Sequence, residues 1–352
     1  MKNFTKLLLC VFLIPAFSYG QVVLSTDSTL QIAENQEAEL AFNQGNSFFA
    51  EGKYGEAINS YSEALRYNPG FSKALVNRGS TYLELANYVS AIGDFNAALK
   101  INSNDEKSYF GMGLANYQLG KVEQSLSNFQ MAITLGWKDE RVEYYMGAAS
   151  FELEQYTDAI KHYTNSIAIK PDFANAYNDR ASAKRMLLQY DAAIEDYILA
   201  IKLDPKLAIT YSNLATVYWK KGSLDEAITN YSMAISINPQ FYIAYNNRAS
   251  VRIEKNDFEG ALIDCNEAIK INNTYSFAYN NRGNAYLKLK KYAEAEKDFT
   301  KALELEPNFG AAYLNRGICR EMQRNFEGAV SDWNSAYDNG ISKAKNYIKF
   351  YE

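Results

Sequence analysis

The sequence predicts an all-α protein, a solenoid in which pairs of antiparallel helices are stacked along the chain. Three observations lead to this fold class. Proline, which cannot continue a helix, recurs at multiples of 34 residues. Small and large apolar side chains recur with the same period, and within each period they are three and four residues apart, as on one face of a helix. The prolines concerned are Pro69, Pro171, Pro205, Pro239 and Pro307.

Residues 1–20 have the pattern of a secretory signal peptide. Two lysines precede an apolar run at 7–17, and Ser18 and Gly20 supply the small residues of a cleavage site before Gln21. The alternative is an uncleaved membrane anchor, but this run has 11 residues, includes Pro15, and falls short of the roughly 20 residues that span a bilayer. We therefore expect an exported protein, periplasmic or secreted, from a bacterium.

The charge of the mature chain limits its partners. Removal of the two lysines of the signal leaves 34 basic residues against 41 acidic residues, a net charge of −7. A general nucleic-acid binder usually has a basic excess, so nucleic acid is not an expected partner. No other segment is long and apolar enough to cross a membrane, so no stable membrane span is expected after the signal is removed.

A catalytic function is not indicated. His162 is the only histidine, which excludes most histidine-based nucleophile and metal arrangements. The sequence has neither a glycine-rich phosphate loop nor a paired-cysteine metal motif. We predict no catalytic residue, no metal site and no cofactor. The two mature cysteines, Cys265 and Cys319, fall in repeats two units apart, which favours two buried free thiols over a disulfide, although export would permit one.

The prolines set the frame of nine units without insertion or deletion, preceded by a polar lead-in at 21–37 that we expect to be flexible or partly helical. The units are 38–71, 72–105, 106–139, 140–173, 174–207, 208–241, 242–275, 276–309 and 310–343. Position 8 of a unit is always glycine or alanine, positions 20 and 27 are alanine or serine, and position 24 is aromatic or cysteine. Each unit is expected to form a helix of about 13 residues, a turn and a second such helix, with the large side chain at position 24 filling the space beside the small ones.

This pattern resembles the tetratricopeptide repeat, which has a small residue at position 8, alanine at 20 and 27, an aromatic at 24 and proline at 32. The resemblance covers 38–343. It implies a right-handed superhelical solenoid whose first helices line a concave groove, with positions 2, 5, 6, 9 and 12 facing that groove. Four units lack the proline, and units three and four lack an aromatic three residues after position 8, so altered packing between repeats is expected there. Residues 342–352 form an amphipathic segment that we expect to be a C-terminal capping helix. Its part beyond the ninth unit is 344–352.

Arginine at position 7 and aspartate at position 23 occur together in five of the nine units and in none separately. Duplication of one ancestral unit would carry both residues along, but covariation also indicates contact. Arginine can meet a carboxylate with two hydrogen bonds, so we predict an ion pair between the two helices of each such unit, a structural role rather than a basic binding stripe. The pairs are Arg78 and Asp94, Arg180 and Asp196, Arg248 and Asp264, Arg282 and Asp298, and Arg316 and Asp332.

Position 6, one of the expected groove positions, is asparagine in six units. These are Asn43, Asn77, Asn213, Asn247, Asn281 and Asn315. A row of amides can donate to and accept from a peptide backbone regardless of its sequence. The alternative is that the amides bond to neighbouring groups of the protein, as most side-chain hydrogen bonds do.

The groove positions of units two to four differ from this row. Position 2 is basic in three consecutive units, as Lys73, Lys107 and Arg141, and position 5 is aromatic at Phe110 and Tyr144. A basic row beside aromatic rings could hold an acidic or carboxylate-bearing segment. The alternative is a solvated charged edge above aromatic residues of the core.

Together these features favour an exported, non-enzymatic scaffold that binds a protein or an extended peptide in the concave groove. Large concave surfaces of this kind are what solenoids provide. An alternative is a glycan-binding or cell-wall-binding envelope protein that uses groove aromatics as stacking platforms.

The signal peptide gives the first testable prediction. Intact-mass measurement of the exported protein should place its N-terminus at Gln21. Replacement of Gly20 by arginine should block cleavage, because the cleavage site requires small residues. Replacement of Gln36 by arginine, beyond the site, is the control and should leave processing unchanged. A wild-type protein that retains residues 1–20 would contradict the prediction.

Overall fold

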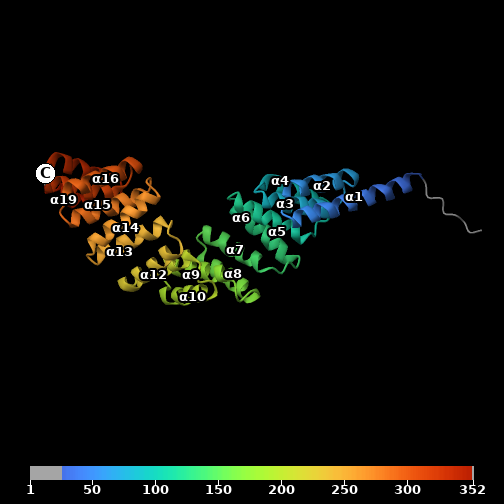
Figure 1. Ribbon diagram of the computed structural model, residues 1–352, viewed down its shortest axis with the longest axis horizontal. Coiled ribbons are helices and arrows are strands. Elements are labelled where there is room, and N and C mark those ends of the chain that lie inside the picture. The colour runs from blue at the N-terminus through green and yellow to red at the C-terminus, as the bar shows by residue number, and fades with distance from the viewer. Residues whose placement is uncertain (1–25, 351–352) are drawn as a thin grey trace, which may run out of the picture. The chain divides into compact units, whose positions relative to one another are not determined.

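In the computed structural model, which describes residues 26–350, the chain is a series of α-helices joined by short turns, and this part contains no β-strand. The helices are α1 (Thr26–Ala50), α2 (Tyr54–Tyr67), α3 (Ser72–Glu84), α4 (Tyr88–Ile101), α5 (Glu106–Gln118), α6 (Val122–Thr134), α7 (Glu140–Glu152), α8 (Tyr156–Ile169), α9 (Ala174–Met186), α10 (Tyr190–Leu203), α11 (Ala208–Lys220), α12 (Leu224–Ile237), α13 (Tyr242–Glu254), α14 (Phe258–Ile271), α15 (Ser276–Lys288), α16 (Tyr292–Leu305), α17 (Gly310–Met322), α18 (Phe326–Asp338) and α19 (Ala344–Ile348) (Figure 1). The expected signal peptide lies outside the described residues.

The predicted all-α fold of paired helices is confirmed. From α3 onward, each first helix begins at position 1 of a 34-residue unit, and from α2 onward each second helix begins at position 17. The first unit differs, because α1 runs without a break from Thr26 to Ala50. The lead-in is therefore helical from Thr26 and continues into the first helix of unit one.

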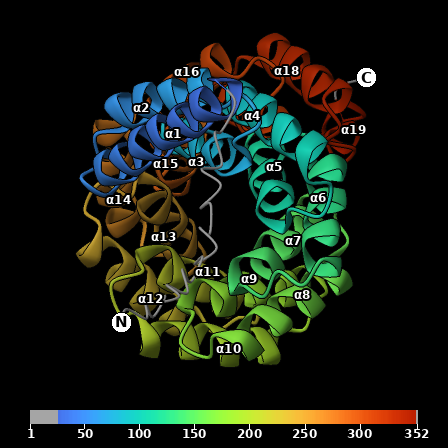
Figure 2. The same cartoon turned by 90° about the vertical axis from the view of Figure 1, so that its right-hand side faces the viewer.

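The described chain forms two compact parts that divide between Ala115 and Asn116, inside α5. The first part holds α1 to α4 and the start of α5, and the second holds the rest of the chain to α19. Within the second part, α9, α11 and α13 lie on the inner, concave side, and α10, α12 and α14 lie on the outer side (Figure 2). First helices thus line the inside, as expected for groove positions.

In eight of the nine units an aromatic ring at position 24 packs beside the glycine or alanine at position 8, and unit seven has Cys265 beside Ala249 instead. Phe95 and Trp333, both at position 24, are 1% and 0% exposed. A Cβ added at Gly79 would lie 2.9 Å from the Phe95 ring, and one at Gly317 would lie 2.4 Å from Trp333 Nε1. Position 8 therefore stays small because the ring of the second helix occupies the space that a side chain would need.

The turn between the two helices has the same conformation in all nine units. Position 15 has a positive φ, between 54° and 81°, at Gly52, Ala86, Gly120, Glu154, Leu188, Gly222, Asn256, Lys290 and Arg324. The following residue donates back into the helix, as Gln189 N does to Lys184 O at 3.0 Å. This hydrogen bond is typical of an α-helix that ends in one residue of left-handed backbone conformation. Only three of the nine residues are glycine, so the other six adopt a conformation that costs an L-residue about 1 kcal/mol.

A short helix covers the C-terminal end of the array. Ala344 and Ile348 of α19 are buried in one cluster with Leu314 and Trp333. The Tyr347 and Trp333 ring centroids are 5.1 Å apart. The expected capping helix is present, although α19 has five residues and is shorter than the predicted amphipathic segment.

The turn geometry predicts the effect of a glycine substitution. Leu188 has φ 59° and is 70% exposed, so its replacement by glycine removes backbone strain and little buried area. We expect Leu188→Gly to raise the free energy of unfolding by roughly 0.5–1 kcal/mol, measured by urea denaturation. The control is the neighbour Leu187, at φ −85°, where glycine should lower stability. Equal destabilisation by both substitutions would contradict this account.

Candidate functional site

The five expected ion pairs are all present, each inside one repeat. In every pair the arginine Nε and Nη2 donate to the two carboxylate oxygens at 2.6–2.9 Å. The aspartate side chains are nearly buried, from 0% exposed for Asp264 to 11% for Asp94. Hydrogen bonding to Asp298 raises the pKa of Arg282 above its ordinary value. These arginines belong to the framework of the protein.

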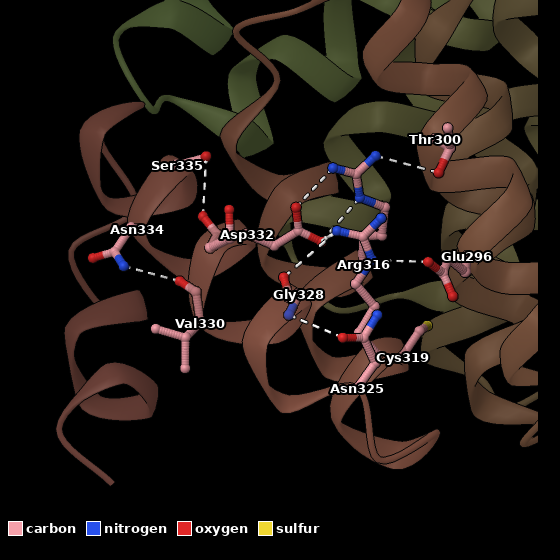
Figure 3. Close-up of polar contacts among 12 residues, drawn as sticks. Glu296, Thr300, Arg316, Cys319, Asn325, Gly328, Val330, Asp332, Asn334 and Ser335 are labelled. Atoms are coloured by element: carbon pink, nitrogen blue, oxygen red, sulfur yellow. Dashed lines mark hydrogen bonds and ion pairs between the residues drawn. The ribbon is translucent and has the colours of Figure 1, made fainter. Parts of the chain in front are cut away.

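Each framework arginine also joins its repeat to the preceding one. Its Nη1 donates at 2.8–3.2 Å to the position-25 side chain of that repeat, which is Ser62, Thr164, Ser232, Asn266 or Thr300. Figure 3 displays this arrangement for Arg316, which contacts Asp332 on one side and Thr300 on the other. Sequence reasoning missed this link. The available signal was that position 25 carries a hydroxyl or amide before every such arginine.

The asparagine row also connects adjacent repeats. In four units the position-6 amide nitrogen donates to position 5 or 9 of the preceding repeat. The bonds are Asn77 to Asn46 at 2.7 Å, Asn213 to Asn178 at 3.3 Å, Asn281 to Asn246 at 2.8 Å and to Ser250 at 2.9 Å, and Asn315 to Asn284 at 2.8 Å. The Oδ1 atoms of these four asparagines accept no hydrogen bond from the described residues. Asn43 is exposed, and Asn247 accepts from Asn246 at 3.2 Å.

Packing explains why the row is interrupted in units three and four. A Cβ at Gly111 would lie 2.3 Å from the Phe95 ring, so position 6 has no room for a side chain there. Tyr145, the next position-6 residue, packs against Tyr117 and Tyr144 at ring-centroid distances of 5.7 and 5.5 Å. An aromatic cluster replaces the amide at this point.

The third interruption, Asp179, is part of a polar network. Its carboxylate accepts from Tyr144 Oη at 2.6 Å and from Asn178 Nδ2 at 2.8 Å. Asn178 in turn accepts from Asn213, so the network connects three repeats. Burial raises the pKa of Asp179, and the two hydrogen bonds oppose that shift. The Tyr144 ring also packs against Tyr145, Tyr163 and Phe173, at ring-centroid distances of 5.5, 5.7 and 4.9 Å.

The predicted basic and aromatic surface is only partly present. Lys73 and Lys107 are exposed and make no ion pair with any described residue. Arg141 pairs with Asp139 at 2.6 Å, and it belongs to the second part of the chain. Phe110 is 8% exposed and lies in the core. Phe110 is therefore part of the core, and the half-buried ring of Tyr144 is packed against Tyr145 and Phe173.

Two adjoining pockets in the first part contain the two lysines. The larger, of about 400 Å³, is lined by Phe42, Lys73, Val76, Asn77 and Lys107 among others. The smaller, of about 320 Å³, shares Val76, Asn77 and Lys107. The larger pocket is also lined by Asp105 and Glu106, so its two lysines lie beside two acidic residues and its charge is balanced.

The remaining reactive side chains have structural partners or are buried. His162 Nδ1 lies 2.7 Å from Glu143 Oε2. Cys265 and Cys319 are buried free thiols, as expected. Burial raises the pKa of both thiols, that of Cys319 to about 12, which keeps them protonated. Within residues 26–350 no helix has both the length and the apolar character needed to cross a bilayer.

Comparison with known proteins is consistent with the repeat architecture. Family models described as tetratricopeptide repeat or TPR repeat match residues 42–106, 147–184, 189–222, 208–241, 242–275 and 276–309. A tetratricopeptide repeat protein from Parabacteroides merdae is 19% identical with a TM-score of 0.56, covering 70% of this chain and 98% of that one. The C-terminal part of a TPR repeat-containing protein from Cytophaga hutchinsonii is 16% identical with a TM-score of 0.56, covering 68% and 98%.

The Cut9–Hcn1 hetero-tetramer of the APC/C gives 14% identity and a TM-score of 0.57, covering 89% of this chain and 75% of that one. At these identities the likeness shows the fold alone. No curated protein matches the chain.

The ion pairs predict a large effect of removing one charge. Asp298→Asn leaves the Arg282 guanidinium, 21% exposed, without its counter-charge. We expect a loss of about 3 kcal/mol in the free energy of unfolding, measured by urea denaturation. Arg282→Met combined with Asp298→Leu should lose less than the single change. Glu267→Gln, in the exposed pair with Lys270, is the control and should have little effect. Equal losses for Asp298→Asn and the control would overturn the framework role.

Proposed function

Because this chain belongs to the tetratricopeptide repeat family, we propose that it is an exported, non-enzymatic scaffold that binds an extended protein segment. The binding surface is the groove lined by the first helices of the repeats. Tetratricopeptide repeat proteins are generally scaffolds, and the solenoid offers a long concave surface for such a segment.

One observation carries the proposal. In the asparagine row, four side-chain amides donate an N–H to the preceding repeat, and their Oδ1 atoms have no donor among the described residues. The cross-link fixes the side-chain orientation in advance, so little conformational entropy is lost when a ligand binds. A peptide backbone supplies N–H donors at regular intervals, whatever its sequence.

The pockets beside Lys73 and Lys107 support a second contact zone in the first part of the chain. The glycan alternative has less support, because Phe110 and Tyr144, its expected stacking platforms, are packed by neighbouring residues.

Export is part of this proposal and rests on the pattern of residues 1–20. A periplasmic or secreted location follows from that pattern, and the N-terminal mass of the exported protein is the test given above.

The groove is tested with the variant Asn213→Ala, Asn281→Ala and a display library of random 12-residue peptides. We expect peptides selected on the wild-type protein to bind the variant about tenfold or more weakly by fluorescence anisotropy, because each lost hydrogen bond contributes about 1 kcal/mol. Asn230→Ala, whose amide donates to Glu226 O on the second helix of its unit, is the matched control. Circular dichroism checks folding. Unchanged binding by the double variant would rule out this surface.

A further inference from the structure

Arg185 differs from the other arginines of the molecule. It lies at position 12 of unit five, on α9, which is on the concave side of the second part (Figure 2). Its side chain is half-buried, and among residues 26–350 it is the one half-buried arginine that makes no ion pair. Its Nε atom is buried and has no hydrogen-bond acceptor within that range. An unpaired, partly desolvated charge is costly, so a carboxylate from outside the chain would be stabilised here.

Two tyrosine hydroxyls, those of Tyr197 and Tyr231, feel the positive charge of the guanidinium. Tyr197 Oη lies 3.0 Å from Ser182 Oγ, and Tyr231 Oη lies 2.8 Å from Thr216 Oγ1. Burial raises the pKa of Tyr197 and of Tyr231, the latter to about 12, and in both the positive charge of Arg185 partly offsets the rise. Arg185 is therefore within electrostatic reach of hydroxyls in two successive repeats.

The groove on one side of Arg185 is apolar and uncharged. Position 2 of units six to eight carries Ile209, Ile243 and Phe277, which are 47%, 37% and 45% exposed. One helical turn later, at position 6, each of these units carries an amide of the asparagine row. Residues four apart lie on the same helix face, so an exposed apolar row lies beside the amide row. Exposed apolar side chains gathered in this way mark binding surfaces.

A buried acceptor in the same stretch has no donor. Asn280, at position 5 of unit eight, is 7% exposed, and its Oδ1 has no hydrogen-bond partner in the described chain. In units five and seven the position-5 asparagine accepts from the next asparagine of the row, but Asn315 donates to Asn284, at position 9, instead. A backbone N–H of a bound peptide would satisfy Asn280 Oδ1.

On the other side of Arg185 the groove positions are filled. Tyr144 and Tyr145 form an aromatic cluster there, and the carboxylate of Asp179 is already bonded to Tyr144 and Asn178. Bulky rings and a buried acid disfavour the continuation of a bound chain in this direction. One positive charge at the end of an uncharged, apolar groove fits a chain terminus better than the middle of an acidic segment.

We propose that units five to eight bind the free C-terminus of a protein whose last residues are uncharged and aliphatic. The terminal carboxylate pairs with Arg185, the preceding backbone contacts the amide row, and the aliphatic side chains lie against Ile209, Ile243 and Phe277. This inference rests on the proposed function and specifies the chemistry of its partner.

The test uses fluorescein-labelled hexapeptide pools of isoleucine, leucine, valine, threonine and serine, prepared as free acids and as C-terminal amides. Binding to the full mature chain is followed by anisotropy. We expect the free acids to bind at least tenfold more tightly than the amides, and Arg185→Met to remove that preference. Arg324→Met, at an exposed arginine in a turn, is the matched control and should retain it. Ile243→Asn with Phe277→Asn should weaken both pools.

Three results would overturn the inference. The free acids and amides could bind equally, Arg185→Met could keep the preference, or amidated peptides with an internal glutamate could bind as tightly as the free acids. If peptides bind and Asn213→Ala with Asn281→Ala weakens them, but no preference for the free acid is seen, the proposed function stands and the C-terminal assignment fails. If no pool responds to the asparagine changes, the groove function itself fails. Thermal unfolding of each variant separates loss of binding from loss of fold.

Discussion

The close approach of the two helices in each repeat is the constraint on which the other features depend. A ring at position 24 lies where the side chain of position 8 would be, as Phe95 does over Gly79 and Trp333 over Gly317. This contact fixes the separation of the helices. At that separation an arginine on the first helix meets an aspartate on the second with two short hydrogen bonds. Unit seven has Ala249 and Cys265 at these two positions, and its Arg248–Asp264 pair has the same geometry as the other four.

The framework arginines extend this local order from one repeat to the next. Each binds the aspartate of its own repeat and a hydroxyl or amide of the preceding repeat, so it couples helices of neighbouring units. Coupling between nearest neighbours is the main source of stability in a solenoid. Because the five framework arginines are bonded in this way, they are not available to bind a ligand. At the groove positions, the cations that make no ion pair with a described residue are Lys73, Lys107 and Arg185.

The groove residues serve both the fold and the proposed binding. An asparagine of the row donates its N–H to the preceding repeat and keeps its oxygen without a donor from the described residues, so one side chain can contribute to stability and, in the proposed function, to recognition. The chemistry changes between the two parts of the chain. The pockets of the first part contain two lysines, whereas the groove of units six to eight combines amides with exposed isoleucine and phenylalanine.

The sequence by itself determined the repeat length, the starts of the helices, the small-to-large packing and the five ion pairs, because periodic spacing and covariation report contacts that recur in every unit. Only the tertiary structure decided which groove groups stay available. Phe110 is buried in the core, and the Tyr144 hydroxyl is bonded to Asp179. Arg141 pairs with Asp139, whereas Arg185 makes no ion pair with a described residue. These outcomes depend on side chains that differ between repeats and on their neighbours in the next unit. A single repeated pattern carries no information about such contacts.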